Sequence, residues 1–526
     1  MKVIKIELKN NNYYVLETDT KSFIEDENVL YFSLNYLKLN KENVKKVLAS
    51  HEVERVVYLD FESFLVMGEL MSVKKIKFDI DKSLTRKVLD KLIILDINRV
   101  ECYFMPSDYV HELSKKKVVI NFNNDMKFDK DFILLDGAMG TMLQQKGMEL
   151  GTVPETLNIT KPDWIIDIHK QYIDAGSDVV YANTFGANRY KMANTGYSVD
   201  ELIGAAINNA KEAAKGTETL VALDMGPIGQ LLEPTGSLSF EEAYDIFKEE
   251  VIAGRNAGAD IIVIETMTDL METKAAILAA KENSDLQVMC TMTFEDNKRT
   301  FTGCSVSAMC LTVQGLGVDA LGVNCSLGPK ELIPIVEEIS KWTTVPIVVK
   351  ANAGLPDPVT NTYNVLPDEF ADTCKEMVKY GAKVLGGCCG TTPAYVAKLK
   401  EMVATVNASV VKKKPRQLAV CTPLKTVVVD QPRIVGERIN PTGKKRFKQA
   451  LRDNDMNYIL SQAIEQIDAG ADILDVNVGS PDIDEKEMMV KVIKALQAIV
   501  DVPLQIDSTK PEVLEAALRV YNGKPI

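Results

Sequence analysis

From Phe132 onward, short runs of aliphatic and β-branched residues alternate with helical stretches of roughly ten to eighteen residues. This alternation predicts strand–helix units whose strands lie parallel. The expected strands end at Asp136, Asn183, Asp224, Glu265, Thr293, Asn324, Lys350 and Gly386. Eight successive units of similar length predict an α/β fold, a closed (β/α)8 TIM barrel over residues 131–406, and disfavour the alternative of an open doubly wound sheet.

The predicted helices carry their own start and stop signals. Pro162 falls near the first turn of a helix that ends at Ala175, and Pro393 opens the last helix. Ser239, followed three residues later by Glu242, forms a capping box. Glycines stand where helices should end, at Gly176, Gly258 and Gly381.

Residues 1–130 differ from the barrel because they are rich in Lys, Asn and Asp, with strand-like runs at 56–59 and 118–120. They predict a small α/β domain, to which the sequence assigns no role. His51 and His111 lie here without a neighbouring metal motif, so we interpret them as ordinary exposed or packed histidines.

Residues 407–432 predict a linker, because Lys412–Arg416 is a basic run and domains usually part at such places. An exposed linker is favoured over an anion-binding patch. Strand–helix alternation then restarts over 433–526 and stops as 523–526 begins a fourth strand. Three units cannot close a barrel of eight. We therefore expect a truncated second barrel, either cut from a longer chain or completed by another polypeptide.

Composition narrows the classes of function. The 526 residues are 46% hydrophobic, enough for several cores, and carry a net charge of −13, which argues against a nucleic-acid surface. The nine cysteines lack disulfide-like spacing, and no signal peptide is apparent. Charged residues interrupt every apolar run before the roughly 20 residues that a membrane helix needs. We expect a soluble, cytoplasmic protein without membrane or nucleic-acid partners.

Three cysteines are predicted to meet at the carboxyl ends of the barrel strands. Cys325 follows the sixth strand, and Cys388 and Cys389 follow the eighth. Alternate strands of such a barrel contribute side chains to the same layer, so the ends of these two even-numbered strands can face one another. Adjacent strand residues point to opposite faces, so the backbone must curl for both to reach one ion. The flanking Gly386, Gly387 and Gly390 permit that curl.

Three thiolates favour a tetrahedral Zn²⁺ with an open fourth position. Such an ion activates water poorly but can hold a substrate thiol deprotonated, which predicts alkylation of a thiol. The alternatives are buried cysteines that act as small hydrophobes, or a strained disulfide between Cys388 and Cys389. We adopt the hydrophobic interpretation for the remaining six, Cys102, Cys290, Cys304, Cys310, Cys374 and Cys421.

Carboxylates at the same rim suggest an amino-acid substrate. Asp136 and Glu265 could bind an ammonium group, while the amides of the turn at Gly137 and Ala138 could bind a carboxylate. Acid/base catalysis or an ion pair are the alternatives, and we favour substrate binding because no partner lysine is obvious.

Asparagines also fall at strand ends, at Asn183, Asn324 and Asn352. We include Asn183 among the substrate-binding candidates. Asn352 is a candidate resting oxygen ligand of the metal that the substrate sulfur displaces; a hydrogen bond that orients a loop explains it equally well.

Four sequence motifs together resemble those of the homocysteine methyltransferase module in the cobalamin-dependent methionine synthase family. They are Asp136–Thr141, Asn183–Asn188, Gly322–Cys325 and Gly386–Pro393. The resemblance covers about 131–406. It implies that Cys325, Cys388 and Cys389 bind zinc, and that Asp136 and Glu265 hold the amino group of homocysteine.

Residues 433–526 resemble the start of the same family's methyltetrahydrofolate-binding module, through the phrases Gly436–Gly443, Asp472–Asn477 and Ile506–Ser508. The resemblance implies that a pterin is surrounded by Glu437, Asn440, Asp475, Asn477 and Asp507. Paired donors and acceptors at strand ends suit a pterin edge. Alone, each such Asp or Asn would be read as a cap or loop contact.

The chain departs from the family because it lacks an Asp-x-His-x-x-Gly motif, and residues 1–130 match no part of the family. We therefore expect a cobalamin-binding module to act in trans or to have been lost by truncation. The hypothesis is transfer of a methyl group from methylcobalamin to zinc-bound homocysteine, with 5-methyltetrahydrofolate as the methyl source. Direct transfer from betaine or S-methylmethionine, and a non-catalytic zinc-binding scaffold, are the alternatives.

Overall fold

The computed structural model describes residues 130–357, 363–406 and 417–526, together with seven strands of the first 125 residues. The chain divides into two compact units, Met1–Asp125 and Met126–Ile526. His51, His111 and the basic run Lys412–Arg416 lie outside the described residues. No helix among the described residues is both long and apolar enough to cross a membrane.

The first unit contains a seven-stranded sheet in the order β2-β1-β3-β4-β5-β6-β7. Strands β1 and β2 pair antiparallel, and all other neighbours pair parallel. The strands predicted at 56–59 and 118–120 correspond to β4 and β7. The bounds are β1 Lys2–Lys9, β2 Asn12–Asp19, β3 Val29–Phe32, β4 Arg55–Tyr58, β5 Ile76–Phe78, β6 Arg99–Cys102 and β7 Val119–Phe122.

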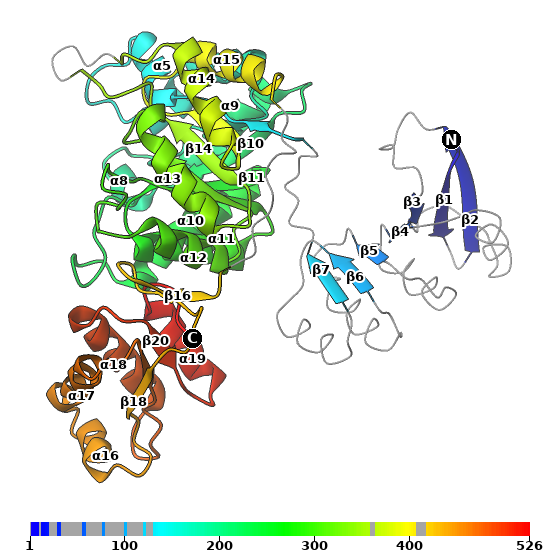
Figure 1. Ribbon diagram of the computed structural model, residues 1–526. Coiled ribbons are helices and arrows are strands. Elements are labelled where there is room, and N and C mark those ends of the chain that lie inside the picture. Colours follow the sequence, from blue (N-terminus) through cyan, green and yellow to red (C-terminus); the bar gives the residue numbers. More distant parts are fainter. Residues whose placement is uncertain are drawn as a thin grey trace. The chain divides into compact units, whose positions relative to one another are not determined.

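The second unit contains the predicted (β/α)8 barrel (Figure 1). Eight parallel strands follow the order β8-β15-β14-β13-β12-β11-β10-β9, and a bridge between Leu135 and Val179 joins the first strand to the second. The fold class is therefore confirmed. The strands are β8 Ile133–Leu134, β9 Val179–Tyr181, β10 Leu220–Met225, β11 Ile261–Met267, β12 Gln287–Met292, β13 Ala320–Asn324, β14 Ile347–Ala351 and β15 Ala382–Gly387.

Helices surround the barrel strands, and their ends follow the sequence signals (Figure 1). The capping box of Ser239 and Glu242 is present, and Gly176 and Gly258 end their helices with φ of 112° and 89°. The described helices of this part are α5 Met139–Gln145, η2 Pro154–Thr156, α6 Leu157–Thr160, α7 Pro162–Ala175, α8 Arg189–Met192, α9 Val199–Ala214, α10 Phe240–Ala257, α11 Leu270–Asn283, α12 Val306–Gly315, α13 Pro329–Trp342, α14 Pro367–Val378 and α15 Pro393–Val403.

The inside of the barrel changes from apolar to polar along the strands. Ala222, Val263 and Val348 belong to a small buried cluster inside the barrel, separate from the large cluster that includes residues of the surrounding helices. Side chains two positions apart in a strand share a face. Asp224, Glu265 and Lys350 therefore point inward one layer closer to the carboxyl ends, where the active sites of such barrels lie.

Residues 417–526 form a smaller module with a three-stranded parallel sheet in the order β18-β19-β20. The backbone of Ile526 exchanges two hydrogen bonds with Leu504 and Ile506, which places the chain end beside β20 as a fourth strand would lie. The elements are β18 Val435–Ile439, α16 Lys445–Arg452, α17 Met456–Asp468, β19 Ile473–Val476, α18 Glu485–Ile499, β20 Leu504–Ile506 and α19 Pro511–Val520.

The predicted linker contains a hairpin that sequence patterning missed, formed by β16 Ala419–Cys421 and β17 Thr426–Val428. Cys421 is fully buried and exchanges backbone hydrogen bonds with Lys524. The strands have only three residues each, which is too short for an alternating pattern to be read.

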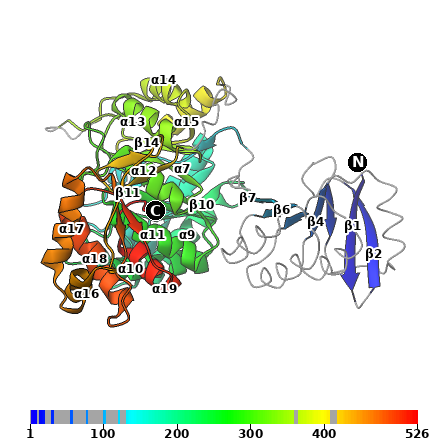
Figure 2. The same ribbon diagram turned by 60° about the horizontal axis from the view of Figure 1, so that its bottom comes forward.

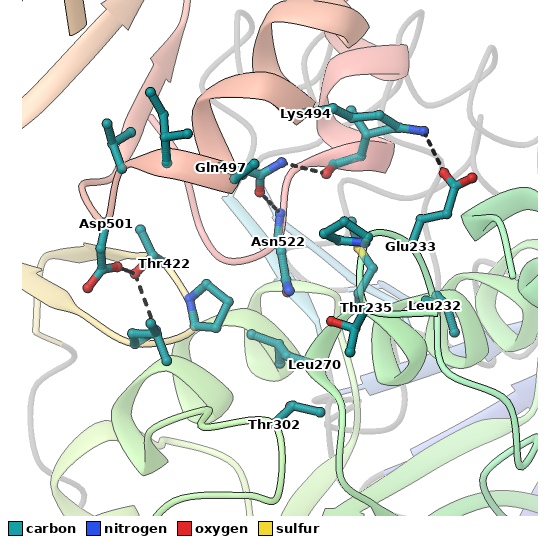
Figure 3. Close-up of a pocket in the computed structure, with 18 of the residues that line it drawn as sticks. Leu232, Glu233, Thr235, Leu270, Thr302, Thr422, Lys494, Gln497, Asp501 and Asn522 are labelled. Atoms are coloured by element: carbon teal, nitrogen blue, oxygen red, sulfur yellow. Dashed lines mark hydrogen bonds and ion pairs between the residues drawn. The ribbon is translucent and has the colours of Figure 1, made fainter. Parts of the chain in front are cut away.

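The module packs against the barrel through α19, which lies beside α10 and α11 (Figure 2). Arg519 forms ion pairs with Glu241 and Glu282, and the buried Lys274 of α11 donates hydrogen bonds to the carbonyls of Leu518 and Tyr521. A cavity of about 860 Å³ lies along this contact, with an ion pair between Lys494 and Glu233 at its edge (Figure 3). No residue of the predicted thiol site lines this cavity.

Candidate metal and substrate site

The three predicted cysteines converge. The sulfur atoms of Cys325, Cys388 and Cys389 all lie within 4.8 Å of one another, and those of Cys325 and Cys389 are 3.9 Å apart. All three thiols are free, so the structure has no disulfide between the adjacent pair. We call these residues the thiol cluster. Their spacing suits one soft metal ion bound by three sulfurs.

Backbone geometry explains how adjacent cysteines reach one point. Cys325 has a φ of 60°, which turns its side chain away from the strand direction. Strand β15 ends at Gly387, where a Cβ atom would lie 2.3 Å from Oγ1 of Thr391. That threonine donates a 2.6 Å hydrogen bond to the carbonyl of Cys388 and closes the turn. Glycine is required there because the curl brings the backbone this close to Thr391.

The thiol cluster loses its first proton easily. Hydrogen bonding from Cys325 and Cys388 lowers the pKa of Cys389 to about 3. Hydrogen bonds with the other two sulfurs, followed by burial, raise the pKa of Cys388 well above its ordinary value. A divalent cation would supply the positive charge needed to deprotonate all three thiols.

The carboxylates at the rim form ion pairs with a lysine that was not obvious from the sequence. The Nζ atom of Lys350 lies 3.4 Å from Oδ1 of Asp136 and 3.3 Å from Oε2 of Glu265. The same ammonium lies 3.5 Å from the ring centre of Tyr181. Lys350 is the last residue but one of β14, the seventh strand, and the inward alternation of that strand brings it to the two acids. We call Asp136, Asp224, Glu265 and Lys350 the interior acid cluster.

Burial governs protonation in this cluster. Desolvation raises the pKa of Asp136 to about 6, although Lys350 opposes the shift. Desolvation likewise raises the pKa of Glu265, again against Lys350. Burial alone would lower the pKa of Lys350, but Glu265, Tyr181 and Asp136 raise it well above its ordinary value. Lys350 is therefore held as an ammonium between the two carboxyl groups.

The asparagines have different surroundings. Asn183 donates to the carbonyl of Pro154 and to Asn158, so its amide nitrogen braces the barrel wall. Asn324 accepts from Thr291 and lies 4.0 Å from the sulfur of Cys388. Asn352 is 4% exposed, and its Oδ1 has no hydrogen-bond partner among the described residues. Its free oxygen leaves it available as a ligand.

The turn that follows β8 is already partly engaged. The amide of Ala138 donates to Oγ1 of Thr391 at 3.3 Å, and a Cβ atom on Gly137 would lie 2.6 Å from the same oxygen. The amide of Gly390 donates to Oγ1 of Thr141 at 3.2 Å. These contacts tie the turn to the cysteine loop.

Sequence reasoning missed Lys350, Asp224 and Tyr363 as parts of the site. Tyr363 packs its ring against Gly390, where a Cβ atom would lie 2.2 Å from it, and its hydroxyl interacts with Cys389. Nothing in the local sequence identifies Tyr363, since it comes from the loop between β14 and α14. Asp224 and Lys350 could have been predicted from the sequence. Each is a polar residue near the end of a strand, and each stands two positions after an apolar residue that faces the barrel interior.

The remaining described cysteines are buried, as the hydrophobic interpretation predicts: Cys290, Cys304, Cys310, Cys374 and Cys421. Burial raises the pKa of each, to about 12 for Cys374. They are poor nucleophiles for that reason. The side chain of Cys102 lies outside the described residues.

Polar residues also gather at the carboxyl ends of the strands in the smaller module. Asp475 accepts from Gln505 at 2.7 Å, and Asn477 donates to Asp507 at 2.9 Å. Burial raises the pKa of Asp475. Asn440 accepts from the amide of Thr442. Glu437 is exposed and pairs with Lys444 at 3.2 Å. Three neighbouring strands thus present donors and acceptors at one edge.

Comparison with known proteins finds matches for both the barrel and the smaller module. Residues 133–403 match the family model for homocysteine S-methyltransferase, and residues 436–526 match the model for pterin binding enzymes. The methionine synthase of Mycobacterium tuberculosis is 31% identical over 415 residues, covering 74% of this chain and 34% of that protein. The methionine synthase of Mycobacterium leprae is 30% identical over 420 residues, with the same coverage. The chain thus spans about a third of the length of these relatives.

Among solved structures, the homocysteine methyltransferase MmuM from Escherichia coli is similar in its oxidized and metallated forms. The sequence identities are 25% and 26%, each with a TM-score of 0.46. Each alignment covers 52% of this chain and 96% of that protein.

Proposed function

The chain belongs to the homocysteine S-methyltransferase family, and we propose that its barrel binds Zn²⁺ through Cys325, Cys388 and Cys389 and methylates the thiol of homocysteine to give methionine. The convergence of the three thiols supports this proposal. A tetrahedral zinc with Zn–S bonds of about 2.3 Å keeps its sulfurs about 3.8 Å apart. The distance of 3.9 Å between two of the cluster sulfurs fits this spacing.

Zinc held by three thiolates would bind the homocysteine sulfur and keep it as a nucleophilic thiolate at neutral pH. The protein supplies the position of that sulfur, because the curled loops fix all three thiols. Asn352 is proposed as the resting oxygen ligand, since its buried Oδ1 has no other partner among the described residues. A weak amide oxygen leaves readily when a substrate sulfur arrives.

The interior acid cluster is proposed to hold the amino group of homocysteine through Asp136 and Glu265. Both carboxyl groups already share Lys350, so the acids are pre-positioned by an ion pair rather than free. The substrate carboxylate is assigned to the turn at Gly137 and Ala138. Asn183 at the end of the second strand completes the proposed pocket wall.

The proposed methyl donor is methylcobalamin, regenerated from 5-methyltetrahydrofolate in the smaller module. The match of 436–526 to pterin binding enzymes supports this assignment, with Glu437, Asn440, Asp475, Asn477 and Asp507 as the pterin contacts. Cobalamin would be carried by a module or protein outside residues 1–526. In the transfer, a bond forms between the homocysteine sulfur and the methyl carbon, and the electron pair of the broken bond leaves with the donor.

X-ray absorption at the zinc edge tests the proposed site directly. We expect three sulfur neighbours around zinc without substrate and four after homocysteine is added, because the substrate sulfur takes the open position. An unchanged count after addition would instead support a closed, non-catalytic zinc site. Activity with betaine or S-methylmethionine, but not with methylcobalamin, would contradict the assigned donor.

Asp507→Asn tests the smaller module separately. We expect the affinity for 5-methyltetrahydrofolate to fall about tenfold to a hundredfold, because a lost charged hydrogen bond is worth roughly 1.5–3 kcal/mol. Titration of the purified chain with the folate measures this loss. Methylation of homocysteine by free methylcobalamin should not change.

The matched control is Asp472→Asn, which lies at the opposite end of β19 and accepts from the amide of Ile434. It should leave folate affinity unchanged. Equal losses in both variants would show that the effect is structural rather than local to the carboxyl ends.

A further inference from the structure

Asp224 is a buried acid at the substrate end of the barrel that the mechanism above does not use. It is the last residue but one of β10, two residues after the inward-facing Ala222. Its side chain points inward for that reason. The residue is 6% exposed, and Oδ1 of its carboxyl group has no hydrogen-bond partner among the described residues.

Charge within the interior acid cluster is unbalanced. Lys350 forms ion pairs with Asp136 and Glu265, and both pairs use the same ammonium group. Asp224 projects into the same interior from β10, the strand that pairs with the strand of Glu265, and it forms no ion pair among the described residues. A buried carboxylate without its own counter-ion costs several kcal/mol, so Asp224 takes its charged form only when a further cation lies beside it.

Building on the proposed function, we propose that Asp224 is a specificity-determining residue that binds the α-ammonium group of the substrate thiol. The incoming ammonium joins Lys350, so that two cations face three carboxylates. A thiol without an amino group cannot make this contact. The barrel thus distinguishes amino-acid thiols from other thiols through a residue beyond the acids already assigned to the amino group.

The protonation of Asp224 agrees with this role. Burial, followed by the charge of Glu265, raises its pKa well above the ordinary value; Asp136 and Glu155 raise it further, and Lys350 opposes them. Burial of this unpaired carboxyl group therefore favours its neutral form before substrate arrives. When the ammonium binds, the carboxyl group gives its proton to solvent and becomes the counter-ion. This ionisation adds about one proton to those released when each substrate binds.

Steady-state kinetics of Asp224→Asn test the proposal. Methyl transfer from free methylcobalamin is measured with homocysteine and with 4-sulfanylbutanoate, which is the same molecule without the amino group. We expect KM for homocysteine to rise at least about tenfold, which corresponds to 1.4 kcal/mol. We expect KM for 4-sulfanylbutanoate and the zinc content to stay within twofold of the unmodified protein.

Glu250→Gln is the matched control. Glu250 is fully buried on α10, and neither of its carboxyl oxygens has a hydrogen-bond partner among the described residues. Its replacement removes a buried titratable carboxyl group outside the barrel interior. KM for both thiols should be unchanged, which separates a local effect at Asp224 from a general effect of removing a buried carboxyl group.

Calorimetric titration with homocysteine in buffers of different ionisation enthalpy provides a second measurement. The unmodified protein should release about one more proton per bound substrate than Asp224→Asn does, because only a titrating acid contributes to this difference. A purely structural role for Asp224 would leave proton release unchanged.

The outcomes separate this inference from the proposed function. If the unmodified protein binds no zinc or methylates no homocysteine, the proposed function fails. If it does both and Asp224→Asn raises KM equally for the two thiols, or for neither, the role of Asp224 is wrong while the proposed function stands.

Discussion

Cys388→Ala is expected to remove zinc from the protein and to abolish methyl transfer to homocysteine. The substitution takes away one of three sulfur ligands, and its neighbours cannot replace it because the next nearest described cysteines are buried elsewhere in the barrel wall. We expect zinc content to fall from near one ion per chain to near zero. The rate with free methylcobalamin should fall by at least about a thousandfold, or roughly 4 kcal/mol. Elemental analysis and a methyl-transfer assay measure both.

Cys374→Ala is the control for this prediction. Cys374 lies buried on α14 with its pKa raised to about 12, so its loss should lower stability slightly and leave zinc content and rate unchanged. Full activity of Cys388→Ala without bound zinc would overturn the proposed mechanism. Loss of zinc in both variants would indicate that the assay reports unfolding instead.

The barrel could be predicted from the sequence because each of its units repeats the same signals. Aliphatic strands, helix caps such as Ser239 with Glu242, and terminal glycines such as Gly258 all agree with one another along the chain. A fold can be predicted from the sequence when the hydrophobic pattern and the local cap and turn signals all indicate the same structure. The hairpin at 419–428 escaped notice because its three-residue strands carry too little pattern.

The thiol cluster was predictable for a different reason. Strand parity places Cys325 and the pair Cys388–Cys389 at one mouth, and the flanking glycines mark the curl that the structure shows. The ion pairs of Lys350 were not predicted. They depend on how far a long side chain reaches across the barrel, and strand order alone does not give that distance. Tyr363 was missed because it reaches Cys389 from a loop.

Lys350→Met is expected to destabilise the barrel by about 3–5 kcal/mol, the usual result of removing one partner from a buried ion pair. The variant keeps the length of the side chain but leaves Asp136 and Glu265 buried without their shared cation. Thermal unfolding followed by calorimetry measures the loss. Lys211→Met is the matched control, because Lys211 pairs with Asp260 near the surface and should cost no more than about 1 kcal/mol.

The pH dependence of Lys350→Met distinguishes lost charge balance from lost packing. The pKa of Asp136 is already raised to about 6 with Lys350 present, and the pKa of Glu265 is raised as well. Without the lysine both values rise further, because the cation that opposed the shift is gone. The folded variant then binds protons that the unfolded chain has released, so its stability falls as pH rises through this range.

Lowering the pH from 8 to about 6 should therefore recover part of the lost stability, because linkage favours the state that holds the protons. A loss that is the same at both pH values would mean that packing of the lysine stem, and not its charge, holds the acids in place.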